Sequence, residues 1–412
     1  MSFIFNDEIR YSDSPNIDAF GRLRVSNPIK LFASTLTITS GDTYYETITT
    51  GSGSETYNVD RSEMQFNVTG NGDSVIREQH GYAYYQPGNS QIVFMTGIFG
   101  SPATGVVKSM GYNNSDDGLM FKLSGSTFGV SLKTSTSGSP VETFIPQSEW
   151  NIDTLDTGHT LNPSGYHLDI TKTNIYVVNF QWLGVGRIIY GLDIDGELVP
   201  VHQILNANNN TAVYMKTANL PVRYEVSSTS GSDSSFRQIC STVITEGGEK
   251  LTGYPNVVSN GLTTRTFSSR QSVISMRLSP TFQGKTNRVI IEPQTIELLT
   301  TTQSVDCYWE LILQRGYLGE TNLGGAPTWV TSPNTPLDYS VNGTTVVGGT
   351  VLDSGFLSIT KQSGTAALTN ILKIKTIMAL DSSGANSDYL HLVVTPNANS
   401  SWSGVIKVIS IY

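Results

Sequence analysis

The chain has few charged residues and no excess of positive charge. Only 14 % of its 412 residues are Asp, Glu, Lys or Arg, against about 25 % in an average globular protein. The net charge is −9 and the isoelectric point is near 5.1. A surface of this kind disfavours the counterion-releasing contacts that bind nucleic acid or anionic lipid. We therefore expect no nucleic-acid partner.

Long hydrophobic runs are also missing. The opening MSFIFNDEIR lacks the basic segment and apolar core of a secretion signal. The most hydrophobic stretch, residues 174–192, is interrupted by Asn179, Gln181, Gly184 and Arg187, whereas a membrane helix needs about 20 mainly apolar residues. We expect neither a signal nor a membrane span.

Cysteine is scarce, and no residue cluster has the spacing of a metal site. Cys240 and Cys307 each lie in an apolar run with no CxxC motif, so two buried free thiols are expected rather than a disulfide. The five histidines are far apart, without HxH or HExxH spacing. We expect no metal and no cofactor.

Glycine is abundant, with 39 residues, and Ser, Thr and Asn are frequent throughout. This composition suits short strands joined by turns, because Gly and Asn adopt positive φ and Ser and Thr bridge loop backbones. A hydrophobic content of 38 % argues against disorder. The chain is therefore predicted to be all-β.

Alternating hydrophobicity marks individual strands. Val178, Phe180 and Trp182 alternate with polar residues, and Asp195-Gly196 predicts a tight hairpin turn after the strand at 187–194. Further predicted strands in the first part of the chain are 63–68, 90–99, 118–123, 128–134 and 236–245.

Seven more predicted strands follow after residue 270. In the strand at 304–314, Val305, Cys307, Trp309, Leu311 and Leu313 share one face. Strands separated by regular turn signals are typical of a β-sandwich. We predict two or more β-sandwich, jelly-roll-like domains: an extended N-terminal segment at 1–40, a sandwich at 41–250, a linker at 251–270 and a C-terminal sandwich at 271–412.

No motif for catalysis is convincing. The segment 100–109, GSPATGVVKS, has the GxxxxG spacing of a phosphate loop, but Val106 stands where the lysine is required and Lys108 comes two positions late. The segment DIDGE at 193–197 lacks the remaining ligands of a calcium loop and is better explained as a hairpin tip. No GxSxG motif occurs. We predict no catalytic residues and no enzyme.

A tyrosine cluster is the one candidate ligand site. Tyr82, Tyr84 and Tyr85 lie within YAYYQPG, and exposed tyrosine rings could stack on sugars. The alternative is that these rings are divided between the core and the sheet surface.

Five sequence blocks follow one another in the first part of the chain: DAFGRLRVSNPIKLF at 18–32, YYQPGNSQIVFMTG at 84–97, the stretch 162–210 with WLGVGR, VYMKTANLPVRYEV at 213–226 and ICSTVITEGG at 239–248. In this order they resemble a family of virion structural proteins of tailed phages and large DNA viruses. The resemblance spans about residues 11–250 and does not extend over 251–412. It implies a virion component made in the host cytoplasm, with other capsid or tail subunits as partners and a homo-oligomeric state.

The same resemblance favours a docking role for the N-terminal segment. Arg22 and Arg24 would face the same way in an extended chain and could pair with acidic groups of a neighbouring subunit, beside Asp18. Phe20 and Leu23 would supply apolar anchors. The alternative is a strand packed on its own domain.

Three functions stay open. The first is a component on the outside of the particle, as capsid decoration or at a vertex or collar. The second is a tail fibre or spike that binds host glycans for attachment. The third is a carbohydrate-active enzyme on a lectin-like sandwich, which a buried carboxylate pair of raised pKa would favour.

Overall fold

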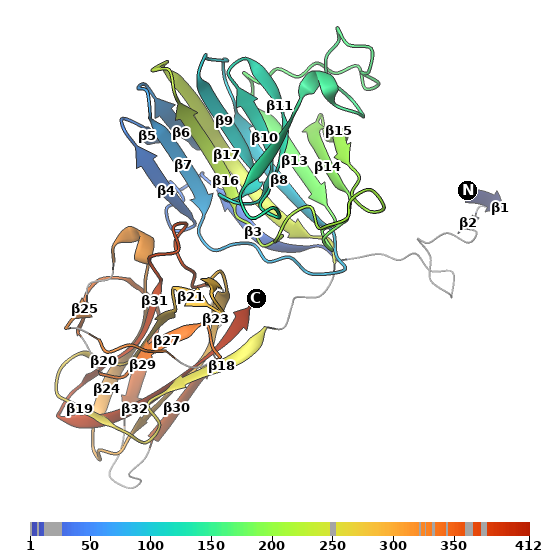
Figure 1. The fold of residues 1–412 in the computed structure, drawn as a ribbon. Coiled ribbons are helices and arrows are strands. Elements are labelled where there is room, and N and C mark those ends of the chain that lie inside the picture. The colour runs from blue at the N-terminus through green and yellow to red at the C-terminus, as the bar shows by residue number, and fades with distance from the viewer. Residues whose placement is uncertain are drawn as a thin grey trace.

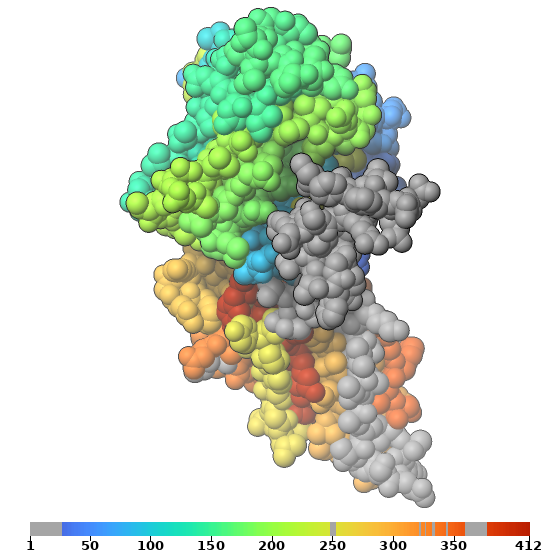
Figure 2. Space-filling model, turned by 90° about the vertical axis from the view of Figure 1, so that its right-hand side faces the viewer, coloured from blue at the N-terminus to red at the C-terminus, as the bar shows by residue number. Residues whose placement is uncertain are grey.

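The computed structural model is all-β, as the sequence predicts. It describes residues 2–5, 8–11, 27–247, 253–320, 323–325, 327–331, 334–342, 345–358, 366–371 and 377–412. Two sandwiches follow one another along the chain and form two lobes (Figures 1 and 2). In the described part, helical structure is limited to two 3₁₀ turns, η1 (Gln147–Glu149) and η2 (Gly316–Leu318). The described residues contain no helix that is long and apolar enough to cross a membrane.

The first sandwich consists of two antiparallel sheets (Figure 1). The seven-stranded sheet has the order β12 (Val141–Pro146), β11 (Thr127–Thr134), β10 (Gly118–Ser124), β9 (Val106–Asn113), β16 (Val222–Ser228), β7 (Ser74–Gln79), β4 (Tyr45–Thr50). The eight-stranded sheet has the order β15 (Glu197–Ile204), β14 (Ile188–Ile194), β13 (Asn174–Phe180), β8 (Gln91–Ile98), β17 (Ser234–Thr245), β6 (Glu63–Val68), β5 (Ser54–Asn58), with β3 (Ile29–Thr35) also paired to β17.

Aromatic rings fill the space between these sheets. Phe121 of β10 packs on Tyr176 of β13 and Tyr190 of β14, with ring centroids 4.9 Å and 5.6 Å apart. The alternation predicted for 174–182 is real, because Val178 and Phe180 point into this core. The turn at Asp195-Gly196 also forms as predicted, with positive φ at both residues.

The second sandwich also has two antiparallel sheets. One contains β18 (Tyr254–Ser259), β32 (Ser400–Ile411), β23 (Ile290–Thr300) and β30 (Ala366–Ile371), with β19 (Arg265–Phe267) also paired to β32. The other contains β26 (Val330–Thr331), β27 (Leu337–Ser340), β20 (Gln271–Leu278), β31 (Tyr389–Pro396), β24 (Asp306–Gln314) and β29 (Thr350–Ser358). Short two-stranded pairs are β1 (Ser2–Phe5) with β2 (Glu8–Tyr11), β21 (Thr281–Phe282) with β22 (Lys285–Thr286), and β25 (Leu323–Gly324) with β28 (Thr345–Val346).

The five residues predicted to share one face of 304–314 are all buried in the core of this second sandwich.

Two segments differ from their expected place. Residues 29–35, expected in an N-terminal arm, form β3 and pair with β17 of the first sandwich. Residues 254–259 and 265–267, expected in a linker, form β18 and β19 and pair with β32. Backbone pairing to a long neighbouring strand explains both differences.

Candidate functional site

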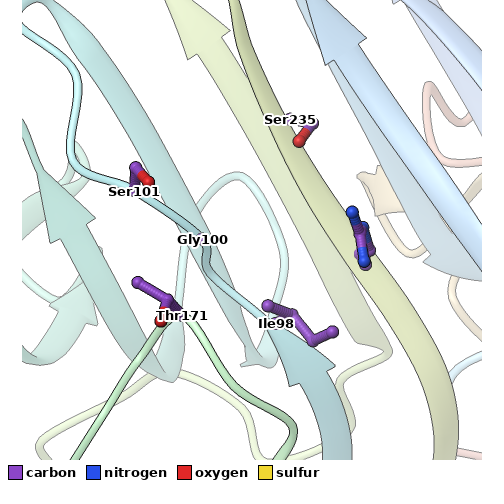
Figure 3. Close-up of a pocket in the computed structure, with 6 residues that line it drawn as sticks. Ile98, Gly100, Ser101, Thr171 and Ser235 are labelled. Carbon is purple, nitrogen blue, oxygen red and sulfur yellow. The ribbon is translucent and has the colours of Figure 1, made fainter.

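A small cavity opens in the first sandwich where β8 ends beside β17. Ile98 pairs with Arg237, and the next residues of the chain turn away from β17, which continues alongside β6. Gly100 has a φ of +72° and donates its N–H to the carbonyl of Ile170, 3.0 Å away. The departure of the chain leaves a cavity of about 230 Å³, lined by Ile98, Gly100, Ser101, Thr171, Ser235 and Arg237. We call it the Arg237 pocket. Figure 3 shows Ser235 on its strand, across the gap from Ile98, Ser101 and Thr171.

Arg237 brings an unused hydrogen-bonding group to this pocket. A guanidinium has five N–H donors, yet that of Arg237 donates no hydrogen bond within the described part of the chain. Its nearest carboxylate is Glu63, at 3.8 Å, and its side chain is 30 % exposed. The hydroxyls of Ser101 and Ser235 likewise have no hydrogen-bond partner among the described residues, whereas Thr171 donates its hydroxyl to Asp169 at 2.5 Å. The pocket therefore offers donors for a ligand.

Lys108 supports the wall of the Arg237 pocket from inside the sandwich. Its side chain starts on β9 of the opposite sheet and is only 1 % exposed. The ammonium donates to the carbonyl oxygens of Phe99 and Ser101, at 2.6 Å and 3.1 Å. Burial lowers the pKa of Lys108 to about 8, and no described carboxylate forms an ion pair with it. The segment 100–109, which has the glycine spacing of a phosphate loop, is thus a turn that leads into β9 at Val106, and Lys108 on that strand holds the turn in place.

A second charged region joins the two sandwiches. Asp388, immediately before β31, accepts from Nε2 of His80 at 2.7 Å and from Nη1 of Arg315 at 2.5 Å. The backbone N–H groups of Gly316 and Ala379 also donate to it, each at 3.2 Å. We call this cluster, with the contacts described next, the joint.

Three more contacts complete the joint. Ser382 donates its backbone N–H and hydroxyl to the carboxylate of Glu46, at 3.0 Å and 2.6 Å. Tyr317 donates its hydroxyl to the carbonyl of Asp42 at 2.6 Å. The guanidinium of Arg288 lies 4.9 Å from the ring centre of Tyr82. Because these contacts come from several strands and loops of both domains, the joint holds the sandwiches in one arrangement.

Burial and charge act against each other on the pKa values at the joint. Burial acts to lower the pKa of His80, but the Asp388 carboxylate and Glu46 outweigh it, so the pKa of His80 is raised. Burial acts to raise the pKa of Asp388, but His80 and Arg315 outweigh it, so the pKa of Asp388 is lowered. Each of the two side chains therefore favours the charged form of the other.

A carboxylate cluster adjoins the joint on the seven-stranded sheet. Arg223 on β16 donates to Glu78 at 3.0 Å and to Glu225 at 2.9 Å, and Glu78 pairs across strands with Glu46. Burial raises the pKa of Glu78, which is 2 % exposed. The sequence contained all these acids but no pattern that selects them, because strand pairing alone brings them together.

The predicted tyrosine platform does not form. Tyr82 and Tyr85 are only 7 % and 5 % exposed, and Tyr84 is half-buried. Tyr82 faces Arg288 at the joint, where burial raises its pKa to about 12. Tyr85 packs against Phe180 in the core. These rings serve packing rather than an exposed surface.

The predicted docking residues, Asp18, Phe20, Arg22, Leu23 and Arg24, lie outside the described residues. Of the cysteines, Cys307 is a buried free thiol and Cys240 a half-buried one. No group of three His, Cys, Asp or Glu side chains in the described ranges is arranged to hold a metal.

Sequence reasoning missed the two charged regions. Arg237 was visible as an outward position of a predicted strand, but nothing indicated that its guanidinium would make no hydrogen bond. His80 and Asp388 are 308 positions apart, so only the packing of one domain on the other brings them together.

Comparisons with known proteins show resemblance in structure only. No protein-family model and no curated protein matches this sequence. Among solved structures, a legume lectin-like domain from Entamoeba histolytica is 9 % identical, covers 52 % of this chain and 97 % of its own, and has a TM-score of 0.31. A glycoside hydrolase family 16 endo-glucanase from Bacteroides ovatus is 9 % identical, covers 52 % of this chain and 99 % of its own, and has a TM-score of 0.35.

A carbohydrate esterase from the Shiga toxin-encoding bacteriophage phi24B is 7 % identical, covers 54 % of this chain and 100 % of its own, and has a TM-score of 0.33. The similar structures thus include several enzymes. They contradict our prediction that the chain is not an enzyme, and that prediction is withdrawn. The missing motifs do not exclude catalysis, because a sandwich can assemble reactive residues from separate strands.

Proposed function

We propose that the protein is a component of the outside of a phage particle and binds a glycan in the Arg237 pocket. The observation that carries the glycan part is the pocket itself, where a guanidinium that donates no hydrogen bond, with its nearest carboxylate at 3.8 Å, and two hydroxyls without a described partner surround one cavity. Binding sites commonly combine an apolar wall with a few converging polar groups. Ile98 supplies the apolar wall here.

Membership of a virus particle is supported by the sequence blocks described above, from DAFGRLRVSNP to ICSTVITEGG. The partners would be other capsid or tail subunits and further copies of this chain, with the N-terminal segment as the docking region. A map of the intact particle tests this part. Density for both sandwiches on its outer surface is expected; absence of the protein from purified particles contradicts the proposal.

Glycan binding is tested on a glycan array with the full chain. Arg237→Gln removes the charge but keeps a polar side chain, and it should abolish binding. Arg187→Gln is the matched control, because Arg187 is an exposed arginine of the same sandwich outside the pocket. Binding that survives Arg237→Gln would place the glycan elsewhere.

Hydrolysis of a glycan is a second candidate function. Its supporting observation is the cross-strand carboxylate pair of Glu46 and Glu78. Burial raises the pKa of Glu78 despite the neighbouring Arg223, which is the direction that a general acid requires. Incubation with the array's bound glycans, followed by mass spectrometry, should then show cleavage that Glu78→Gln removes. Intact glycans after incubation with the unmodified protein would reject this function.

A further inference from the structure

We propose that the Arg237 pocket selects acidic sugars by binding a sugar carboxylate. This inference rests on the proposed glycan-binding function and names its substrate class. Neutral sugars present only hydroxyls, which a serine or an amide can satisfy. A carboxylate matches the planar guanidinium with two parallel hydrogen bonds, and Arg237 has those donors unused.

The charges around the pocket favour an anion. Arg237 lies in the lining itself, and the Lys108 ammonium lies directly behind it: a side chain placed on Gly100 would come within 3.8 Å of Nζ. No carboxylate is among the lining residues. The nearest acids are outnumbered by cations: Glu63 lies 3.7 Å from Arg61 and 3.8 Å from Arg237, and Asp169 lies 3.3 Å from Lys172. On a chain with a net charge of −9, this is a local positive site.

Lys108 also orients the wall toward an anion. An ammonium group can only donate hydrogen bonds. That of Lys108 lies inside the sandwich, so the carbonyl oxygens of Phe99 and Ser101 that accept from it are directed into the protein. Those partial negative charges therefore point away from the cavity. The Ser101 and Ser235 hydroxyls remain free to donate to the carboxylate or to the ring hydroxyls of the sugar.

The size of the pocket limits the ligand. A volume of about 230 Å³ is below the roughly 300 to 1,000 Å³ of pockets that enclose drug-sized molecules. It suits one sugar residue, with the carboxylate at Arg237 and a C–H face on Ile98. Recognition of a single terminal or branching acidic sugar is expected, rather than of a long chain.

The test compares a sugar acid with its own ester. The methyl glycoside of glucuronic acid and its methyl ester differ only at the carboxyl group, which the ester makes neutral and enlarges by one methyl. Titration of the full chain, followed by NMR or calorimetry, should show the acid binding at least tenfold more tightly, with an affinity that falls as salt rises. Arg237→Gln should remove the preference, Arg237→Lys should keep only part of it, and Arg187→Gln should change nothing.

Equal affinity for acid and ester, with both lost in Arg237→Gln, would overturn the acidic-sugar inference and leave glycan binding intact. If neither sugar binds but inorganic sulfate does, through Arg237, the pocket is an anion site and the proposed glycan function fails. Lys108→Met gives a second variant that leaves every lining residue in place. This variant should weaken binding of the acid more than binding of the ester. An unchanged ratio of the two affinities would show that Lys108 does not contribute to selectivity.

Discussion

The joint and the Arg237 pocket both contain arginine near carboxylates, but they differ in how far those groups are satisfied. At the joint, Asp388 receives four hydrogen bonds and Arg315 also donates to the carbonyl of Ile377. In the pocket, Arg237 donates none within the described structure and lies 3.8 Å from its nearest acid. A carboxylate that accepts four hydrogen bonds holds a fold together, whereas a guanidinium that donates none is available to a ligand.

The largest expected effect is at the joint. Asp388→Asn removes the carboxylate that neutralises His80 and Arg315 and leaves buried positive charge without a partner. Loss of one member of a buried ion pair costs about 3 to 5 kcal/mol. Urea unfolding should show a lower midpoint, and the extrapolated free energy of unfolding should fall by that amount. Asp195→Asn is the control, because asparagine suits the positive φ of that exposed turn; an equal loss in both variants would refute the role of the joint.

A smaller effect should follow the charge of His80. Because its folded pKa is raised, its contribution is complete below the unfolded pKa of about 6.5 and is lost as the pH rises through the folded value. Asp388, with a lowered pKa, contributes above about pH 4. The joint should therefore be most stable between about pH 4 and 6.5.

His80→Gln isolates this contribution. The difference in unfolding free energy between the unmodified protein and the variant should be about 1.5 to 3 kcal/mol near pH 5.5, as for a hydrogen bond to a charged group, and should shrink toward pH 9. The pKa values of Lys108 and His391 are lowered in the folded protein, so these groups make it more stable as the pH rises. Their contributions are the same in both proteins and cancel in the difference. A difference that does not change with pH would show that His80 is neutral at the joint.

The smallest effect is expected in the pocket. Arg237→Gln should change the unfolding free energy by no more than about 0.5 kcal/mol, because surface substitutions away from satisfied networks rarely do more. The same urea experiment checks it. A loss of several kcal/mol would mean that Arg237 is structural, and the contrast between pocket and joint would disappear.

Many strands with one buried face were predictable, although β7 and β16 were not among those predicted. The expected strand at 63–68 is β6 to the residue, and the hairpin of β14 and β15 follows its turn sequence. One edge strand that escaped prediction is β18, in which Val258 is the only buried side chain, so no alternation marks it. Its Pro255 is also a residue that strands tolerate mainly at edges.

The charged regions could not be predicted, for a different reason. Periodicity reports which face of a strand is buried, but not which strand lies beside it. Lys108 reaches its two carbonyls across the sandwich, and Glu78 meets Arg223 only because β7 and β16 are neighbours. Whether a charge is paired depends on such long-range neighbours.

Gly81, at the joint, limits which second domain the first sandwich can be combined with. Its φ is +77°, and a Cβ there would overlap the side chain of Ile377 and lie 3.7 Å from that of Ala379. The first sandwich thus presents a gap without a side chain beside His80 and Glu46, shaped for this particular partner. A different second domain grafted at residue 253 would need its own counterparts of Ile377, Asp388 and Arg315, so the two sandwiches are not interchangeable modules.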